Sequence, residues 1–396
     1  MLPYLGVLLA TALTTFAATP VVRWLANRFG AIDRPSDRKV HPKPTPTLGG
    51  LAIWLGVLVG LWAASVIPSF RGVFALSSEP LGVAIAGTVI VALGAYDDLR
   101  GIAPPAKVAG QVLAAGILIL FGVQLVYFWV PGLGVLSLSP DLAVPLTLLW
   151  VLAMVNALNL IDGLDGLAAG VAAIAAGAFF VYAFQAADPT FAAEAGTAGP
   201  SPAALLTAVV VGAAIGFLPY NFHPARIFMG DSGSMLLGLV LAAATVSGVG
   251  RTDSPANPDF AALAIPVMIP LLVLAVPITD VILAVIRRLR RGRAIFRPDK
   301  EHIHHRLLEI GHSHRTAVLL MYLWSALLAA AALAITYVRS RALALVLLGS
   351  VLVLLVGTAV PRVFRPNGRE RGLRASAEGA AGNGEPAARR SGTSRR

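Results

Sequence analysis

The chain has 396 residues, of which 57% are hydrophobic and 13% charged, and its mean hydropathy is +0.78. Soluble domains carry about 25% charged residues, so this composition excludes an ordinary soluble enzyme. The formal charge of +11 could indicate nucleic acid, but basic loops beside apolar segments more often contact anionic lipid. We therefore expect a lipid bilayer and no nucleic acid as partner. Because the chain has no cysteine, disulfides, thiolate nucleophiles and Cys-ligated zinc are excluded.

Eleven apolar stretches approach or reach the ~20 residues that a membrane-spanning helix needs. Their apolar runs are continuous rather than alternating, which favours helices over barrel strands. The first stretch passes into Arg23 without a small-residue cleavage pattern, so we expect it to be retained. The predicted fold class is an all-α polytopic membrane protein with spans at about 2–22, 48–68, 81–96, 106–126, 142–160, 166–185, 202–220, 233–250, 260–286, 316–338 and 342–361.

Basic residues are concentrated in loops on one side of these expected spans. Of the 31 Lys and Arg, only Arg71, Arg251, Arg339 and Arg341 fall in loops on the opposite side. Because basic loops remain in the cytoplasm, we predict a plasma-membrane protein with its amino terminus outside and its carboxyl terminus inside. Residues 1–361 would form the membrane domain. The tail 362–396 is rich in Arg, Gly, Ala and Ser and is expected to be disordered.

The first inner loop, 23–47, contains several prolines that exclude one continuous helix. Its basic residues, among them Lys43, are equally consistent with binding a phosphate and with anchoring to the membrane surface. The second inner loop begins with Asp97-Asp98. Adjacent carboxylates repel one another unless a cation lies beside them, which favours a metal or catalytic site over a helix cap. Lys107 follows, one turn before Gln111, and suits phosphate as a point charge.

The most informative stretch is MVNALNLIDGLDGLAAG at 154–170, which follows an apolar run. Four polar side chains occur there at a spacing of three residues. Residues three apart are neighbours on a helix, so the two amides can point at the same place. Acids and amides at a membrane rim are costly unless they bind something. The four side chains are those of Asn156, Asn159, Asp162 and Asp165. The alternative interpretation is an ordinary polar turn between two helices.

Two further inner loops carry candidate residues. In YNFHPARIFMGDSGSMLLG, four polar residues lie within eleven positions just before and at the start of a helix, whose amide end favours anions: Asn221, His223, Arg226 and Asp231. A single Asp at such a start is usually a cap. The loop 287–315 carries a His-x-His-His run that could bind zinc with Asp299 or Glu301. An anion-binding loop is the more economical interpretation of its histidines, which are His302, His304 and His305.

The acidic positions Asp97-Asp98, Asp162/Asp165 and Asp231 are each separated by two membrane crossings. All three therefore return to the same face and can converge there. Carboxylates and amides provide the oxygen ligands that suit Mg²⁺, and Mn²⁺ accepts the same ligands. This donor set predicts metal-assisted phosphate chemistry with one lipid substrate and one water-soluble substrate.

Five motifs resemble the polyprenyl-phosphate N-acetylhexosamine-1-phosphate transferases, in the family's order and over nearly all of residues 1–361. The His-x-His-His form resembles the branch that transfers GlcNAc-1-phosphate to undecaprenyl phosphate. The phospho-N-acetylmuramoyl-pentapeptide transferases differ in this loop and remain the alternative, as does another UDP-HexNAc specificity. The motifs are HPKPTPTLGG at 41–50, DDLRG at 97–101, NALNLIDGLDGLA at 156–168, NFHPARIFMGD at 221–231 and PDKEHIHHRLL at 298–308.

The resemblance implies that UDP-GlcNAc and undecaprenyl phosphate react to give undecaprenyl-diphosphate-GlcNAc and UMP, the first membrane step of a cell-wall or surface polysaccharide. It implies that Asp231, Asn156 and Asn159 hold Mg²⁺. Asp97 and Asp98 would position or deprotonate the lipid phosphate or assist the metal, and Asp162 and Asp165 would contact nucleotide or metal. Substrate binding would fall to Lys43, Lys107, Asn221, Arg226, His302, His304 and His305.

A transporter and a scaffolding protein are the two alternative classes. Transporter sites lie near the bilayer midplane on broken helices, whereas nearly every candidate residue here lies at one rim. Asp280, late in the ninth expected span, is the exception. A scaffolding protein would leave the convergence of the acids unexplained. The sequence is compatible with a homodimer.

Overall fold

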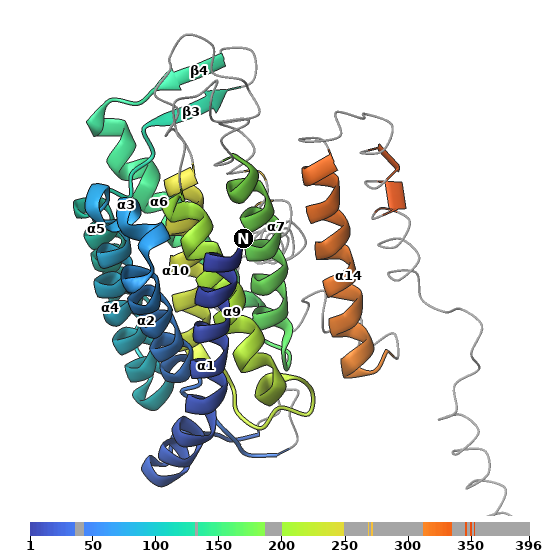
Figure 1. Ribbon diagram of the computed structural model, residues 1–396. Coiled ribbons are helices and arrows are strands. Elements are labelled where there is room, and N and C mark those ends of the chain that lie inside the picture. Colours follow the sequence, from blue (N-terminus) through green and yellow to red (C-terminus); the bar gives the residue numbers. More distant parts are fainter. Residues whose placement is uncertain are drawn as a thin grey trace, which may run out of the picture.

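The computed structural model of the protein describes residues 1–35, 43–130, 134–186, 200–248 and 312–334, with isolated positions between 268 and 352. Within these residues the chain is almost entirely helical, as predicted, and its long helices form a bundle (Figure 1). The helices are α1 (Leu2–Phe29), α2 (Gly50–Val66), the 3-10 turn η1 (Pro68–Phe70), α3 (Arg71–Leu76), α4 (Glu79–Arg100), α5 (Pro104–Leu120), α6 (Pro140–Ile161), α7 (Leu167–Ala186), α9 (Pro202–Asn221), α10 (Gly230–Gly248) and α14 (His314–Leu333).

Seven of the described helices are long and apolar enough to cross a bilayer, and α2 with its bent continuation would make eight. The apolar helix α5 is shorter, with 17 residues. The chain is therefore a multi-pass membrane protein. The spans expected at 260–286 and 342–361 lie outside the described residues, and every other expected span corresponds to a helix. The total of eleven spans stays a prediction.

Three helix boundaries differ from the sequence expectation. α1 has 28 residues, about 42 Å at 1.5 Å per residue, which exceeds a hydrocarbon core of ~30 Å. Its last turns therefore project beyond the other helices (Figure 1). The chain bends by 90° after α2 and forms η1 and α3 where a plain loop was expected. α4 continues to Arg100, so Asp97 and Asp98 lie within its last turns rather than in a loop.

Two short antiparallel hairpins are the β-structure of the described chain. β1 (Ile32–Asp33) pairs with β2 (Thr45–Pro46) and joins the end of α1 to the approach to α2. β3 (Tyr127–Val130) pairs with β4 (Gly134–Ser137) at the opposite end of the bundle. In the sequence, Gly132 and Gly134 with alternating residues predict a short hairpin within 127–141, and the second hairpin confirms it.

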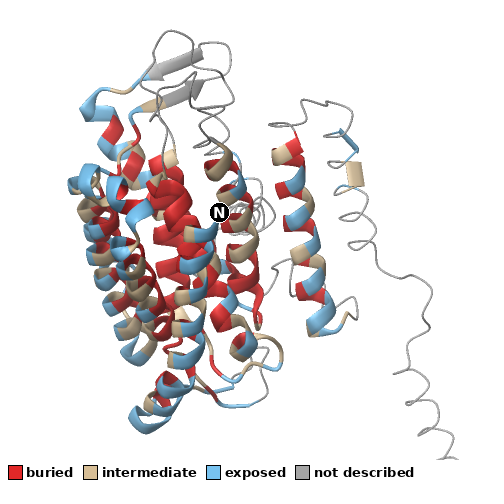
Figure 2. Cartoon of the chain, in the orientation of Figure 1, coloured by how far each residue is buried: buried red, intermediate tan, exposed pale blue. Residues whose placement is uncertain are grey.

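α10 is the central helix of the bundle. Every residue from Ser232 to Ser247 is buried, and α2, α4, α6, α7 and α9 all pack against this helix (Figure 2). A helix that is apolar all round is expected to be buried on all sides. The residue at the start of this helix, Asp231, is therefore held by the most fully packed element of the fold.

Glycines allow α10 to lie very close to its neighbours, as is common for helices that pack within a bilayer. A Cβ built on Gly94 of α4 would overlap the Ser232 backbone. A Cβ on Gly50, the first residue of α2, would overlap the backbone of Gly233. The amino terminus of α10 is thus wedged between α2 and the last turns of α4.

We expect Gly94→Ala to separate α4 from α10 and to abolish most of the activity, because the added methyl group has no room against backbone atoms. Gly116→Ala, in the exposed neighbour α5, is the matched control, since a Cβ there would meet nothing within 4 Å. It should be neutral or stabilise by up to about 1 kcal/mol. Thermal unfolding and turnover of the purified variants measure both effects, and equal behaviour of the two variants would contradict the packing argument.

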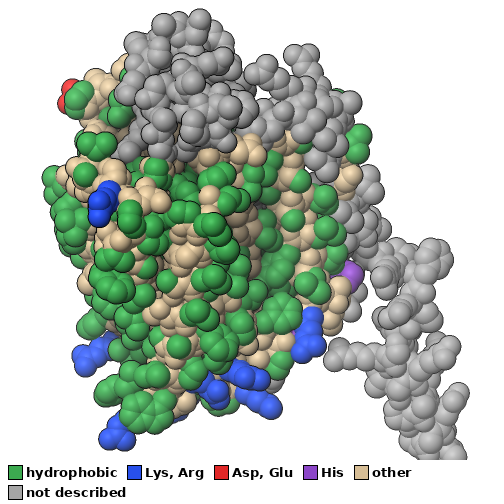
Figure 3. Space-filling model, viewed as in Figure 1, with side chains coloured by type: hydrophobic (Ala, Val, Ile, Leu, Met, Phe, Trp, Pro, Cys, Tyr) green, Lys and Arg blue, Asp and Glu red, His purple; other side chains and the backbone are tan. Residues whose placement is uncertain are grey.

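Basic side chains gather at the end of the bundle where α1 ends and α2 begins (Figure 3). Among the described Lys and Arg residues, Arg71 at the start of α3 is the one that lies at the opposite end. The basic end holds Arg23, Arg28, Arg34, Lys43, Arg100, Lys107, Arg226 and Arg315.

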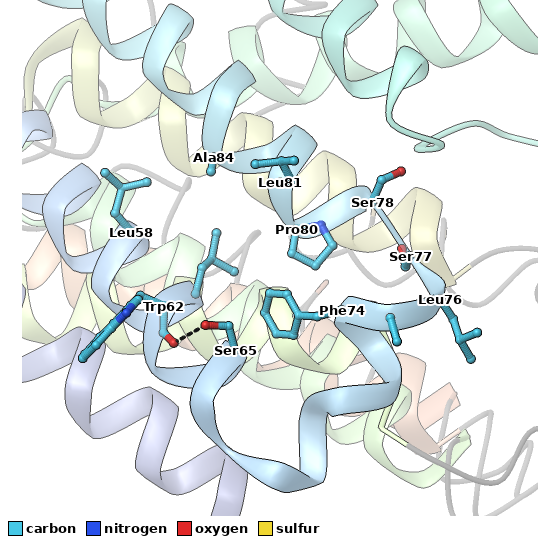
Figure 4. A pocket seen from close by; sticks show the side chains of 12 residues that line it. Leu58, Trp62, Ser65, Phe74, Leu76, Ser77, Ser78, Pro80, Leu81 and Ala84 are labelled. Carbon is cyan, nitrogen blue, oxygen red and sulfur yellow. Dashed lines mark hydrogen bonds between the residues drawn. The ribbon is translucent and has the colours of Figure 1, made fainter.

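A cavity of about 640 Å³ lies at the opposite end, between the last turns of α2, α3 and the first turns of α4 (Figure 4). Its walls are mainly apolar, including Leu58, Trp62, Phe74 and Leu81, with serine hydroxyls at intervals. No acidic residue lines it, so this cavity is distinct from the acidic positions that the sequence singles out.

Candidate active site

Polar side chains from four helices meet at the basic end of the bundle. α4 and α6 end there, and α5 and α10 begin there. Lys107, in the first turn of α5, places its Nζ 2.9 Å from Asp97 Oδ2 and also pairs with Asp231 Oδ2. One ammonium group therefore joins the end of α4 to the start of α10, as the convergence of the acidic positions predicts.

The turn between α4 and α5 fixes the distance between Asp97 and Lys107. Gly101 adopts a positive φ of 72° and ends α4, and Pro104-Pro105 begin α5 three residues later. Glycine adopts this backbone conformation without strain. Asp97 Oδ1 accepts a hydrogen bond of 2.7 Å from the Ile102 amide, so the carboxylate is held by the turn on one side and by lysine on the other.

Asp98 uses both carboxylate oxygens to cap α10. Its Oδ1 accepts from the Asp231 amide at 2.9 Å. Its Oδ2 accepts from the Ser232 amide at 3.3 Å and from Ser232 Oγ at 3.0 Å. The first amides of a helix lack partners within that helix, and a negative charge there is favourable. Asp98 thus fixes the turn that carries Asp231, whereas its neighbour Asp97 contacts Lys107.

The two asparagines of α6 have different partners. Asn159 Nδ2 donates to Asp231 Oδ1 at 2.6 Å and to Ser234 Oγ at 3.0 Å. Asn156 instead exchanges hydrogen bonds with buried Gln111 of α5, at 2.8 and 3.3 Å. The expectation that both amides point at one place is therefore not met, and Asn159 is the one beside Asp231.

Asp162 lies directly after α6, in the loop 162–166 that leads to α7. Its enclosure by protein raises the pKa of the Asp162 carboxyl well above its usual range, and the negative charges of Asp231, Asp98 and Asp165 raise that pKa further. Carboxylates that face other carboxylates behave in this way unless a cation compensates them. Asp162 therefore belongs to the acidic group around Asp231.

The approach to α2 is hydrogen-bonded to the approach to α10. The Gly49 amide donates to the Phe228 carbonyl at 3.0 Å, and the Gly50 amide donates to the Met229 carbonyl at 2.9 Å. Gly230 has a positive φ of 71°, and a Cβ there would strike the Asp98 carboxylate. The motif that contains Lys43 is thus attached to the Asp231 turn, and Lys43 itself is exposed just before β2.

Asp165 lies in a separate cluster of side chains. Its Oδ2 is 2.7 Å from His223 Nδ1 and accepts from the Ala225 amide at 3.0 Å. Its backbone amide donates to His314 Nε2 at 3.1 Å. The sequence draws attention to both histidines, but neither His223 nor His314 was predicted as a site residue. They stand in the runs NFHPAR and GHSHR, but nothing in one sequence shows that these runs meet.

The remaining substrate-binding candidates have varied positions. Asn221 is buried, where its Oδ1 accepts from the Gly166 amide at 3.0 Å and its Nδ2 donates to the Ile227 carbonyl at 3.1 Å. Its observed contacts therefore hold loops together. Arg226 is exposed, and its backbone amide donates to the Tyr220 carbonyl. His302, His304 and His305 lie outside the described residues.

The donor set around Asp231 suits a hard divalent cation. Within the described part of the chain, the Lys107 ammonium group pairs with two carboxylates, those of Asp97 and Asp231, and the negative charges of Asp98 and Asp231 also act on Asp162. All the candidate donors are oxygen atoms, and oxygen ligands are those that Mg²⁺ prefers. The position of the Lys107 ammonium between two carboxylates shows that positive charge is favoured there.

The comparisons with known proteins agree with this geometry. The model of glycosyl transferase family 4 matches residues 80–249, which include α4 to α10. The chain is 42% identical to decaprenyl-phosphate N-acetylglucosaminephosphotransferase of Mycobacterium tuberculosis, over 90% of this chain and 88% of the relative. It is 42% identical to the protein of the same name in Mycobacterium leprae, over 90% of both chains.

A more distant relative comes from Bacillus subtilis. That protein, a probable undecaprenyl-phosphate N-acetylglucosaminyl 1-phosphate transferase, is 35% identical over 80% of both chains. Identity at this level over most of the chain shows the relationship. The protein belongs to glycosyl transferase family 4.

Proposed function

We propose that the protein transfers GlcNAc-1-phosphate from UDP-GlcNAc to a polyprenyl phosphate, giving polyprenyl-diphosphate-GlcNAc and UMP. The observation that carries the proposal is the meeting of Asp97, Lys107 and Asp231 from three helices, in a chain whose relatives bear the names of such transferases. The product would begin a cell-wall or surface polysaccharide on its lipid carrier.

The reaction needs no nucleophile from the protein. An oxygen of the polyprenyl phosphate attacks the β-phosphorus of UDP-GlcNAc, and the bond from that phosphorus to the bridging oxygen breaks, so UMP leaves with the bond's electron pair. Both reactants are anions, so the protein must compensate charge before they meet. The second pKa of a phosphate is about 6, so the attacking phosphate is largely ionised at neutral pH.

We propose Mg²⁺ as cofactor, held by Asp231 and Asn159, with Asp162 beside them. Bound there, it would neutralise the diphosphate and polarise the bond to UMP, and Mn²⁺ would serve through the same oxygen ligands. Asn156 is the weaker candidate ligand because its amide is already paired with Gln111.

The positions of the other candidate residues indicate the roles that we propose for them. Asp97 and Lys107 would orient the lipid phosphate, since they lie together where α4 ends and α5 begins, at the basic end of the bundle. Asp98 would act by fixing Asp231. The exposed side chains of Lys43 and Arg226 would attract the UDP diphosphate, as would the predicted anion-binding histidines at 302, 304 and 305.

We further propose that the active site faces the cytoplasm. The concentration of basic side chains at this end supports the orientation, because basic loops remain inside. Single cysteines can be placed at Asn27, exposed at the end of α1, and at Ser139, exposed at the opposite end. In intact cells an impermeant maleimide should label position 139 but not 27, and the reverse pattern would contradict the orientation.

Incubation of the purified protein with polyprenyl phosphate, Mg²⁺ and a panel of UDP-sugars tests the proposed specificity. The products can be identified by mass spectrometry of the lipid fraction. We expect polyprenyl-diphosphate-GlcNAc from UDP-GlcNAc and little product from UDP-glucose. Efficient transfer from UDP-N-acetylmuramoyl-pentapeptide instead of UDP-GlcNAc would support the sister branch.

A further inference from the structure

The loop 162–166 connects the acidic group to a second set of side chains. At its start, the Asp162 amide donates to the Asn159 carbonyl at 3.3 Å, and the Asn159 side chain donates to Asp231 Oδ1 at 2.6 Å. At its end, Asp165 and Gly166 form hydrogen bonds through both backbone amides, the Asp165 carboxylate and the Gly166 carbonyl. The Gly170 amide of α7 also donates to the Gly166 carbonyl, and the other partners of these four groups come from outside α6 and α7.

Those partners lie on two segments distant in sequence. The end of α9 contributes Asn221, whose Oδ1 accepts from the Gly166 amide, and the loop after it contributes His223, whose Nδ1 is 2.7 Å from Asp165 Oδ2. α14 contributes His314, whose Nε2 accepts from the Asp165 amide at 3.1 Å, and Tyr322, whose hydroxyl donates to the Gly166 carbonyl. We call these four partners the loop clamp.

Two glycines make room for the side chain of Tyr322 in the loop clamp. A Cβ on Gly170 would overlap the ring of Tyr322, and one on Gly166, where φ is +81°, would lie 3.4 Å from the Tyr322 hydroxyl. Glycines one helical turn apart therefore make the space into which this tyrosine fits. Arg315 adds a further contact between α14 and the loop, because its Nε donates to the His223 carbonyl at 3.1 Å.

The same residues could be taken for a metal site. The possible ligand atoms of Asp165, His223 and His314 lie within 4.8 Å of one another. However, the two imidazole rings are stacked, with centroids 4.2 Å apart and planes inclined by only 14°. A metal ion bound by imidazole lies near the plane of the ring, and two stacked rings do not share such a position. The hydrogen bonds already described account for the arrangement.

We propose that His223, His314 and Tyr322 are positioning residues that hold the loop 162–166 so that Asp162 lies beside Asp231. The hydrogen bonds of the loop clamp are a feature of the fold, whereas their effect on turnover rests on the proposed function. Misplacement of a reacting group by about 1 Å can lower a rate 100-fold. α14, which contributes no acid to the site, thereby sets the geometry of the site.

Hydrogen–deuterium exchange of the purified protein tests the clamp without substrate. Tyr322→Phe removes one hydroxyl, and Tyr220→Phe is the matched control, because the Tyr220 ring packs on Phe16 outside the clamp. We expect peptides covering 162–168 to exchange up to about tenfold faster in Tyr322→Phe, as the loss of one hydrogen bond allows, and to be unchanged in Tyr220→Phe. Equal exchange in both variants would overturn the clamp.

Kinetics with paired variants then test the positioning role. Gln carries an oxygen near the place of Nε2, so His314→Gln retains an acceptor for the Asp165 amide and His314→Leu does not. We expect kcat to fall about tenfold or more in His314→Leu, with little change in the KM for UDP-GlcNAc, and to recover in His314→Gln.

Equal kcat in His314→Leu, His314→Gln and the unaltered protein would overturn the positioning role. An equal loss in both variants would also overturn it, since the acceptor would then not be what matters. Failure of the unaltered protein to turn over UDP-GlcNAc would contradict the proposed function, while the exchange experiment would still decide the clamp.

Discussion

Asp231→Asn is expected to lower kcat by about 10³-fold, the upper range for removing one group that stabilises transition-state charge. Asparagine keeps the size of the side chain but removes the charge that pairs with Lys107 and lies 2.6 Å from the Asn159 amide nitrogen. If Asp231 holds Mg²⁺, the variant should regain part of its activity only as the Mg²⁺ concentration is raised. Steady-state kinetics over a range of Mg²⁺ concentrations measures both effects.

Asp141→Asn provides the matched control for that change. Asp141 is exposed in the first turn of α6, as Asp231 is placed in the first turn of α10. Both substitutions therefore remove a similar favourable interaction with a helix dipole, but Asp141 lies at the opposite end of the bundle. Asp141→Asn should keep nearly full activity. Near-normal turnover of Asp231→Asn at low Mg²⁺ would remove Asp231 from the proposed metal site.

Substitution of the adjacent acids Asp97 and Asp98 by Asn is expected to affect the stability of the protein to different degrees. Asp98→Asn replaces one accepting oxygen with an NH₂ group, which cannot accept from the α10 amides. Loss of such a cap costs about 1–2 kcal/mol. In a chain longer than about 250 residues this lowers Tm by at most about 2 °C per kcal/mol. Asp97→Asn should lower Tm less, because its carboxylate lies at a turn beside Lys107.

Both variants should lose about 10²-fold in kcat, the lower range for a positioned catalytic group. For Asp97→Asn we expect kcat and kcat/KM to fall together, as happens when an interaction made in the transition state is lost. The measurements are thermal unfolding in detergent and kinetics with each substrate varied in turn. Wild-type turnover of Asp97→Asn, or an unchanged Tm of Asp98→Asn, would contradict the division of roles.

The sequence was sufficient to predict the helical class and the end of the bundle at which the site lies. Apolar runs of about 20 residues have few alternatives to a membrane helix, so each expected span within the described residues was found. Convergence of Asp97, Asp162 and Asp231 followed from counting crossings, because polar positions separated by two spans must return to the same face. Gly132 and Gly134 with alternating residues likewise indicated the β3–β4 hairpin.

The partners of individual side chains could not be predicted, since they depend on packing between distant segments. Asp98 caps a helix that begins 133 residues later. The spacing of Asn156 and Asn159 was compatible with a shared target, but the rotation of α6 against α5 directs Asn156 to Gln111. His223 and His314 were single histidines in unrelated motifs until α14 placed their rings against each other.

The boundaries of α1 and α4 were missed for a related reason. Charged residues such as Arg23 and Asp97 lower the hydropathy, and the apolar runs were taken to end there. Both residues are nevertheless compatible with a helix, and α1 continues to a left-handed Gly30 whereas α4 continues to Gly101. Helices extend past the apolar run, and in α4 that extension carries two of the acids of the site, Asp97 and Asp98.

The central claim is tested most directly by measuring UMP released by the purified protein from UDP-GlcNAc, with and without polyprenyl phosphate, in the presence of Mg²⁺. The account predicts UMP only when the lipid phosphate is present, in equal amount to the polyprenyl-diphosphate-GlcNAc formed, and almost none with Asp231→Asn. Release of UMP without the lipid, or release that persists undiminished in Asp231→Asn, would contradict it.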